Sequence, residues 1–164
     1  MKTAEFTVDE FSGGLTESAE IAALHLVVRQ WEHANGQYVF QDMYNSQVDL
    51  GDISTHYQIP GGNFWVARES IDDEITGFVG LKKTGEDTGM MKRLAVLPHW
   101  HGNRIGTLLV GSLIDWAGDN GFRSLELTTG IDEKALPIYE RFGFVITGFL
   151  DDSKYDHVMK LDLS

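Results

Sequence analysis

The chain has 164 residues, 42% of them hydrophobic, and a formal net charge of −12 at pH 7. This acidity argues against nucleic acid as a partner, because phosphate backbones require basic surfaces. The sequence has no cysteine, which excludes disulfides, thiolate nucleophiles and Cys-based metal sites. It has no run of about 18 apolar residues that would span a membrane, and its start does not resemble a signal peptide. We therefore expect one domain over residues 1–164, located in the cytoplasm.

The N-terminal part predicts a strand followed by a long helix. Residues 2–11 suit a strand, and Ser12-Gly13-Gly14 is typical of a turn. Thr16 is the expected N-cap of the helix, and Asn35-Gly36 is expected to end it. Apolar residues recur at helical spacing along this helix and are expected to face the core: Ile21, Leu24, Val28 and Trp31.

Residues 37–62 carry weaker signals. A short helix is expected over residues 48–57, before the break at Pro60-Gly61-Gly62. Four polar side chains in this helix leave two interpretations open, because they could line a substrate pocket or form a solvated helix face. These residues are Asp49, Asp52, His56 and Tyr57.

The middle of the chain predicts three strands, over residues 64–67, 75–81 and 90–97. The first two form a hairpin around the turn at residues 71–74. Gly77 and Gly80 inside the second strand indicate a bulge or the close approach of another chain segment. The third strand is apolar enough to lie at the centre of a sheet.

The C-terminal part alternates helices and strands: a helix over 102–119, a strand over 124–129, a helix over 132–142, and strands over 144–148 and 155–163. The complete order of elements implies an α/β (α+β) fold, a mixed sheet with helices on both faces. Pro137 raises a conflict, because a proline inside a helix removes a hydrogen bond. Either the last helix starts later than Asp132 or it bends at this proline.

Two stretches carry the functional signal. In residues 94–107 an apolar strand leads through Gly102 and Gly106 into a helix. The start of a helix gathers unpaired N–H groups and the positive end of the helix dipole, so it favours phosphate groups. Ordinary α/β crossovers use the same pattern. The second stretch, residues 132–144, reads on its own as an amphipathic helix with a packed Tyr139.

Together, these stretches resemble the two hallmark motifs of the GNAT N-acetyltransferase superfamily. The matching residues are Val96, Pro98 and Gly106 in the first stretch and Ala135, Tyr139, Gly143 and Phe144 in the second. The resemblance implies a single-domain fold with a twisted, mostly antiparallel mixed sheet of about seven strands. It implies acetyl-CoA as co-substrate, acetyl transfer to a primary amine, and no metal. Because no cysteine offers a thiolate, we expect direct attack of the amine on the acetyl group, with a Ser or Thr acyl-enzyme as the open alternative. The negative charge fits a small-molecule amine as the acceptor.

The resemblance also implies which residues form the site. The pantetheine arm would pair with the strand, and the pyrophosphate would lie on the loop and the helix start. The implied coenzyme-binding residues are Leu94, Ala95, Val96, His101, Gly102, Asn103, Arg104, Ile105, Gly106 and Thr107. Tyr139 would be the catalytic general acid toward the departing thiolate, since a neutral phenol with a pKa near 10 can donate a proton at pH 7.

Three positions depart from the family pattern. His101 stands in place of Arg or Gln, Arg104 in place of glycine, and Asp132 in place of Asn. The side chain of Arg104 could crowd the phosphates, point outward, or fold over the pyrophosphate as a bidentate donor. Further candidates for phosphate contact, with solvated surface as the alternative, are Lys92, Arg93 and Lys134.

The general base is left unassigned. Its candidates are Glu126, His25, His33 and His56. The motif departures motivate an alternative function, a non-catalytic acyl-CoA-binding or regulatory module on the same fold. The aromatic-rich C-terminal strands could support a homodimer, and core packing explains them equally well.

Overall fold

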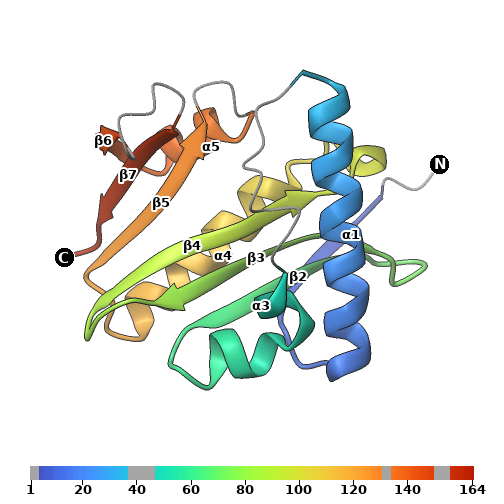
Figure 1. Ribbon diagram of the computed structural model, residues 1–164, viewed down its shortest axis with the longest axis horizontal. Coiled ribbons are helices and arrows are strands. Elements are labelled where there is room, and N and C mark those ends of the chain that lie inside the picture. The colour runs from blue at the N-terminus through green and yellow to red at the C-terminus, as the bar shows by residue number, and fades with distance from the viewer. Residues whose placement is uncertain (1–3, 37–46, 131–133, 150–155) are drawn as a thin grey trace.

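The computed structural model describes residues 4–36, 47–130, 134–149 and 156–164. Seven strands form one sheet in the order β1-β2-β3-β4-β5-β7-β6 (Figure 1). Only β4 and β5 pair in parallel, so the expected mostly antiparallel mixed sheet is confirmed. The strands are β1 (Phe6–Glu10), β2 (Asn63–Glu69), β3 (Ile75–Lys83), β4 (Thr88–Val96), β5 (Ser124–Gly130), β6 (Val145–Phe149) and β7 (Asp156–Asp162).

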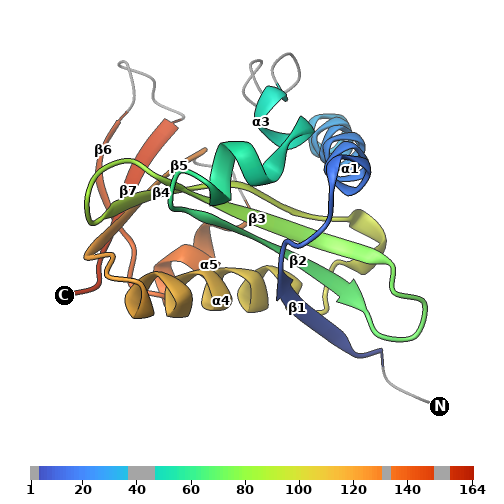
Figure 2. The same cartoon turned by 90° about the horizontal axis from the view of Figure 1, so that it is seen from below.

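Helices cover both faces of the sheet, as expected (Figure 2). One face carries α1 (Leu15–Ala34), α3 (Val48–Gly51) and the π-helical turn η1 (Ser54–Gln58), and the other carries α4 (Ile105–Asp119) and α5 (Leu136–Arg141). A short 3₁₀ turn, η2 (Pro98–Trp100), links β4 to α4. Each face has its own apolar core, one around Phe64 and Phe78 and one around Leu109 and Leu127.

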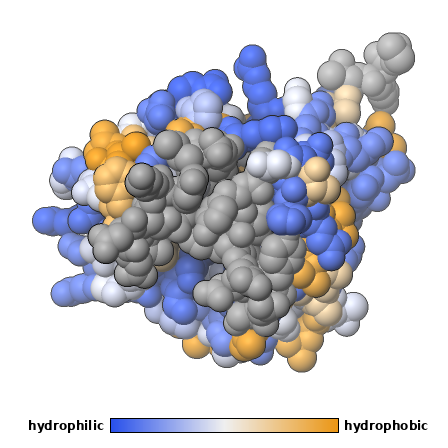
Figure 3. Space-filling view, turned by 45° about the horizontal axis from the view of Figure 1, so that its top comes forward, coloured by the Kyte–Doolittle hydropathy of each residue, from blue (hydrophilic) through white to orange (hydrophobic). Residues whose placement is uncertain are grey.

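Hydrophilic side chains predominate among the coloured residues of the surface in Figure 3, as the net charge of −12 leads one to expect. Within the described ranges, no helix combines the length and apolarity that crossing a membrane requires.

Helix α1 buries Ile21 and Val28, as expected, and also His25 and Arg29. It ends at the expected place, since Asn35 is the C-cap and Gly36 adopts a φ of 82°. The expected N-cap is wrong. The helix already begins at Leu15, with Gly14 as an N-cap that makes no side-chain hydrogen bond, so Thr16 lies inside the first turn.

The start of α5 resolves the conflict at Pro137. The helix begins at Leu136, so the proline lies in its first turn, where its missing N–H costs no helical hydrogen bond. The expected start at residue 132 is therefore wrong, and residue 132 itself lies outside the described residues. The helix ends before Gly143, which adopts a φ of 100°.

Residues 48–57 form α3 and η1 rather than one continuous helix. Both glycines of β3 lie where another segment comes close, as expected. A Cβ on Gly77 would lie 2.7 Å from the Ala95 carbonyl oxygen, and one on Gly80 would lie 2.6 Å from Cε1 of Tyr57. The register between β3 and β4 also shifts here, opposite Arg93, which has a φ of 63°.

Strands β4 and β5 pair over only part of their lengths. The pairs join Thr88–Met90 to Ser124–Glu126, although β4 continues to Val96 and β5 to Gly130. Leu97 N–H bonds to Thr76 of β3 at 2.9 Å. Because backbone groups alternate in direction along a strand, the carbonyls of Leu94 and Val96 face the side of β4 away from β3.

Candidate functional site

A cavity of about 370 Å³ lies where β4 ends. Its walls come from residues 94–96 of β4, residues 100–106 of the loop and α4, Lys134 and Ala135 with Ile138 near the start of α5, and four residues of α1. The contribution of α1 consists of Val28, Arg29, Trp31 and Glu32. All the predicted coenzyme-binding residues except Thr107 line this cavity.

The predicted catalytic residue lies beside the cavity rather than on its wall. Tyr139 is 4% exposed and packs edge to face on Phe144, with ring centres 6.0 Å apart. Its neighbour Ile138 lines the cavity. The role of Tyr139 stays a prediction.

The loop before α4 owes its shape to two left-handed residues. Gly102 has a φ of 86°, and Arg104, the N-cap of α4, has a φ of 60° and a ψ of 25°. Asn103 closes the loop by donating from Nδ2 to the Trp100 carbonyl at 3.0 Å. A left-handed N-cap explains why glycine suits position 104, and the side chain of Arg104 is exposed.

We expect Arg104→Gly to raise the free energy of unfolding by up to about 1 kcal/mol. An L-residue pays about 1–2 kcal/mol in the left-handed region, and the greater flexibility of glycine in the unfolded chain offsets part of that gain. Urea unfolding measures the change. The matched control, Gly102→Ala, has open space around its Cβ but a φ of 86°, so it should destabilise. Equal stability of Arg104→Gly and the wild type would contradict backbone strain at this N-cap.

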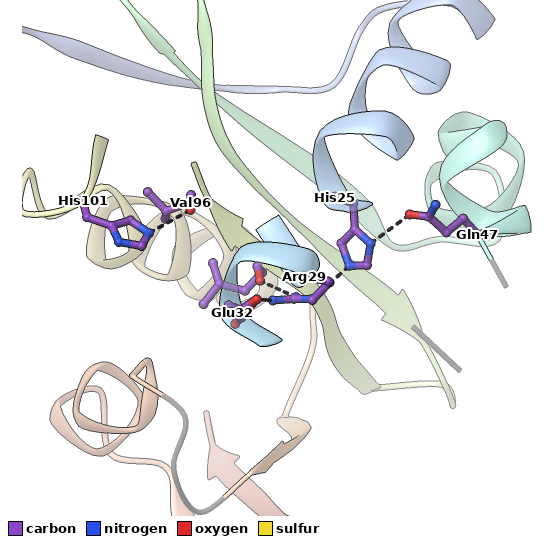
Figure 4. A network of polar contacts seen from close by, with 7 residues as sticks. His25, Arg29, Glu32, Gln47, Val96 and His101 are labelled. Atoms are coloured by element: carbon purple, nitrogen blue, oxygen red, sulfur yellow. Dashed lines mark hydrogen bonds and ion pairs between the residues drawn. The ribbon is translucent and has the colours of Figure 1, made fainter. Parts of the chain in front are cut away.

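His101 and Trp31 connect the loop to α1. His101 Nε2 donates to the Val96 carbonyl at 3.0 Å (Figure 4). The His101 ring meets the Trp31 ring edge to face, with ring centres 5.0 Å apart. The Lys134 ammonium lies 5.1 Å from the centre of the Trp31 ring. Trp31 therefore joins the loop to the segment before α5 across one side of the cavity.

A buried polar network ties α1 to β4 (Figure 4). Arg29 is 5% exposed, and all three nitrogens of its guanidinium have partners. Nη2 donates to the Leu94 carbonyl at 2.8 Å and Nε donates to His25 Nε2 at 3.2 Å. Nη1 forms an ion pair with Glu32. Since His25 Nε2 accepts, Nδ1 carries the proton and donates to Gln47 at 2.8 Å. Sequence reasoning missed Arg29 and Glu32, whose only local signal is that Arg29 follows Val28 on the buried stripe.

His25 is unsuited to act as the general base. Burial, together with the charges of Arg29 and Arg93, lowers the pKa of His25 to about 3, and its basic nitrogen already accepts from Arg29. The other three base candidates are not among the residues that line the cavity. Among them, Glu126 is half-buried on β5 and faces Lys160 in the register with β7.

The neutral His25 makes stability depend on pH. The unfolded chain binds a proton near pH 6.5 and the folded protein near pH 3, so stability present at pH 7 is lost as the pH falls through this window. The expected slope approaches about 1.4 kcal/mol per pH unit. Urea unfolding at pH 7 and 5 should show a smaller loss in His25→Gln than in wild type or in His33→Gln, whose side chain is exposed. Equal losses in all three would contradict this role.

Two of the four polar residues of α3 and η1, Asp49 and Tyr57, belong to a hydrogen-bonded cluster with Arg93. Asp49 accepts from the Tyr57 hydroxyl at 2.6 Å and from Arg93 Nη2 and Nε at 2.9 and 3.0 Å. Burial alone would raise the pKa of Asp49, but these hydrogen bonds hold it below its usual value. Arg93 is thus directed to Asp49, at the point where the register between β3 and β4 shifts.

Comparisons with known proteins agree with this geometry. The model of the Acetyltransferase (GNAT) family matches residues 22–144. Probable N-acetyltransferase camello of Xenopus laevis is 36% identical over 100 residues, which cover 58% of this chain and 45% of the relative. N-acetylaspartate synthetase of Danio rerio is 31% identical over 108 residues, which cover 64% and 38%. The matched region spans about half the length of such curated relatives or less.

Solved structures share the fold. A GNAT-family acetyltransferase of Staphylococcus aureus Mu50 has a TM-score of 0.79 at 20% identity, covering 98% of this chain and 100% of that one. A putative acetyltransferase of Salmonella typhimurium, solved with its cofactor acetyl-CoA, has a TM-score of 0.74 at 18% identity, covering 98% and 95%.

Proposed function

The chain belongs to the GNAT acetyltransferase family, and on this premise we propose that it transfers an acetyl group from acetyl-CoA to a primary amine, with a small-molecule amine as the favoured acceptor. The observation that carries the proposal is the cavity at the end of β4, which combines the N-terminus of the 15-residue α4 with Arg104 and Lys134. In a chain of net charge −12, such a local concentration of donors and cations suits a ligand with several phosphates.

Within this proposal, N–H groups at residues 102–107 receive the pyrophosphate, and Arg104 and Lys134 add charge. The pantetheine arm lies along residues 94–96 of β4. Two of the carbonyls there already accept hydrogen bonds, Leu94 from Arg29 and Val96 from His101. His101 is exposed and can give way to a ligand, whereas Arg29 is buried and held by several partners.

The chemistry requires a neutral amine and a protonated leaving group. The acceptor nitrogen bonds to the acetyl carbon as the carbon–sulfur bond breaks, and the amine loses one proton while the thiolate gains one. An alkylamine with a pKa near 10.4 is neutral in only about one molecule in 10³ at pH 7, a cost of about 4–5 kcal/mol. Tyr139 supplies the proton to the thiolate in our proposal.

Calorimetry with acetyl-CoA, combined with a free-thiol release assay over a panel of amines, tests the function. We expect saturable binding and thiol release matched by acetylated amine. The second candidate function, a non-catalytic acyl-CoA-binding module, is favoured by the departures at His101 and Arg104. Binding without thiol release on any amine would select that module, and absence of binding would overturn both.

A further inference from the structure

Resting on the proposed function, we propose that Glu32 of α1 receives the ammonium group of the acceptor, which makes the acceptor class strongly basic alkylamines. Positive and negative side chains line different sides of the cavity, and this separation of charge supports the assignment. Arg104 and Lys134 supply its positive charge from the loop and from the start of α5. Among the described residues that line the cavity, Glu32 is the only carboxylate.

Glu32 is held close to the β4 backbone. One of its carboxylate oxygens, Oε1, pairs with Nη1 of Arg29, and Nη2 of the same guanidinium donates to the Leu94 carbonyl at 2.8 Å (Figure 4). A single guanidinium group therefore separates this carboxylate from the segment of β4 along which the coenzyme is proposed to lie. The Glu32 side chain is 14% exposed, so water screens its charge only partly.

The second oxygen of Glu32 supplies the binding capacity. Oε2 forms no hydrogen bond with any residue in the described part of the chain. Next to Glu32 on α1, the ring of Trp31 already makes a cation–π contact with the Lys134 ammonium, which lies 5.1 Å from the ring centre. Oε2 is thus the carboxylate atom on this wall with capacity to accept from a second ammonium.

The charge balance predicts the order in which the ligands bind. The Arg29–Glu32 pair is neutral by itself, so it attracts a cation weakly. Coenzyme phosphates in the same cavity add several negative charges and make an ammonium next to Oε2 favourable. The amine should therefore bind more tightly when coenzyme A is present.

The test compares Glu32→Gln with Glu20→Gln, which removes the same charge from an exposed position on the same helix. With n-butylamine as acceptor, we expect Glu32→Gln to raise KM for the amine at least tenfold and to keep the Kd for acetyl-CoA within twofold of the wild-type value. Glu20→Gln should keep the wild-type values of both constants. Aniline, which is neutral at pH 7, should be a poor acceptor for all three proteins. Unchanged KM in Glu32→Gln, or an equal loss of acetyl-CoA affinity, would overturn the assignment.

A binding measurement covers the case in which n-butylamine is not acetylated. Methylammonium chloride is titrated into the protein with coenzyme A present, and the indole signal of Trp31 is followed by NMR against potassium chloride of equal ionic strength. A saturable shift in the wild type that is lost in Glu32→Gln supports the proposal, and absence of that shift in the wild type overturns it. Failure of the proposed function would instead show as no heat on titration with acetyl-CoA, and it would remove this proposal as well.

Discussion

Replacing Tyr139 with phenylalanine is expected to lower turnover on an accepted amine by about 100-fold or more while acetyl-CoA affinity stays unchanged. The substitution keeps the ring that packs on Phe144 and removes only the hydroxyl. Loss of a positioned proton donor typically costs about 10²–10⁴ in rate. Because the proposed donor acts on the departing thiolate, the defect should appear in kcat and not in the Kd of the coenzyme.

Tyr57→Phe is the matched control for Tyr139→Phe. Tyr57 is also buried, but its hydroxyl donates to Asp49 at 2.6 Å, away from the cavity wall. Its loss should lower stability by about 1–2 kcal/mol and leave kcat of the folded protein unchanged. Unchanged turnover in Tyr139→Phe would remove this residue from the mechanism, and an equal loss of turnover in both variants would point to a packing effect.

Local backbone constraints explain which parts of the site could be predicted from the sequence. Residues 94–107 predict a strand, a turn and a helix because glycine, proline and the apolar spacing each restrict the backbone locally, and the structure has those elements. The same local reasoning correctly predicts that α1 ends at Asn35-Gly36. It fails at the start of α5, where Pro137 favours a first-turn position but does not by itself fix the boundary.

Long-range pairing explains what the sequence concealed. Arg29 and Leu94 are 65 residues apart, and Asp49 and Arg93 are 44 apart, so neither contact leaves a local pattern. A cation in an amphipathic helix is ordinarily taken as solvent-exposed. Only the packing of α1 over the end of β4 shows that Arg29 is buried and that Glu32 faces the cavity.

Arg29→Met is expected to destabilise the protein by about 3 kcal/mol or more, because removing one member of a buried ion pair leaves its partner charge uncompensated. The variant also leaves the Leu94 carbonyl and His25 Nε2 without the donor that each has in the structure. Methionine keeps most of the apolar stem, so the loss reports on the guanidinium. Urea unfolding at pH 7 measures the change in free energy.

Arg68→Met provides a comparison between the buried Arg29 and an arginine that is more exposed. Arg68 of β2 pairs with Glu17, so it also links α1 to the sheet, but the two side chains are 23% and 24% exposed, against 6% and 14% for Arg29 and Glu32. Ion pairs near the surface contribute about 0–1 kcal/mol, so Arg68→Met should cost less than Arg29→Met, about 1 kcal/mol. If Arg29→Met costs no more than Arg68→Met, the network does not fix α1 on β4, and the position of Glu32 beside the β4 backbone needs another cause. If Arg29→Met loses more unfolding free energy than Arg68→Met, the Arg29 network holds α1 on β4 in the ligand-free protein and so positions the α1 side of the cavity.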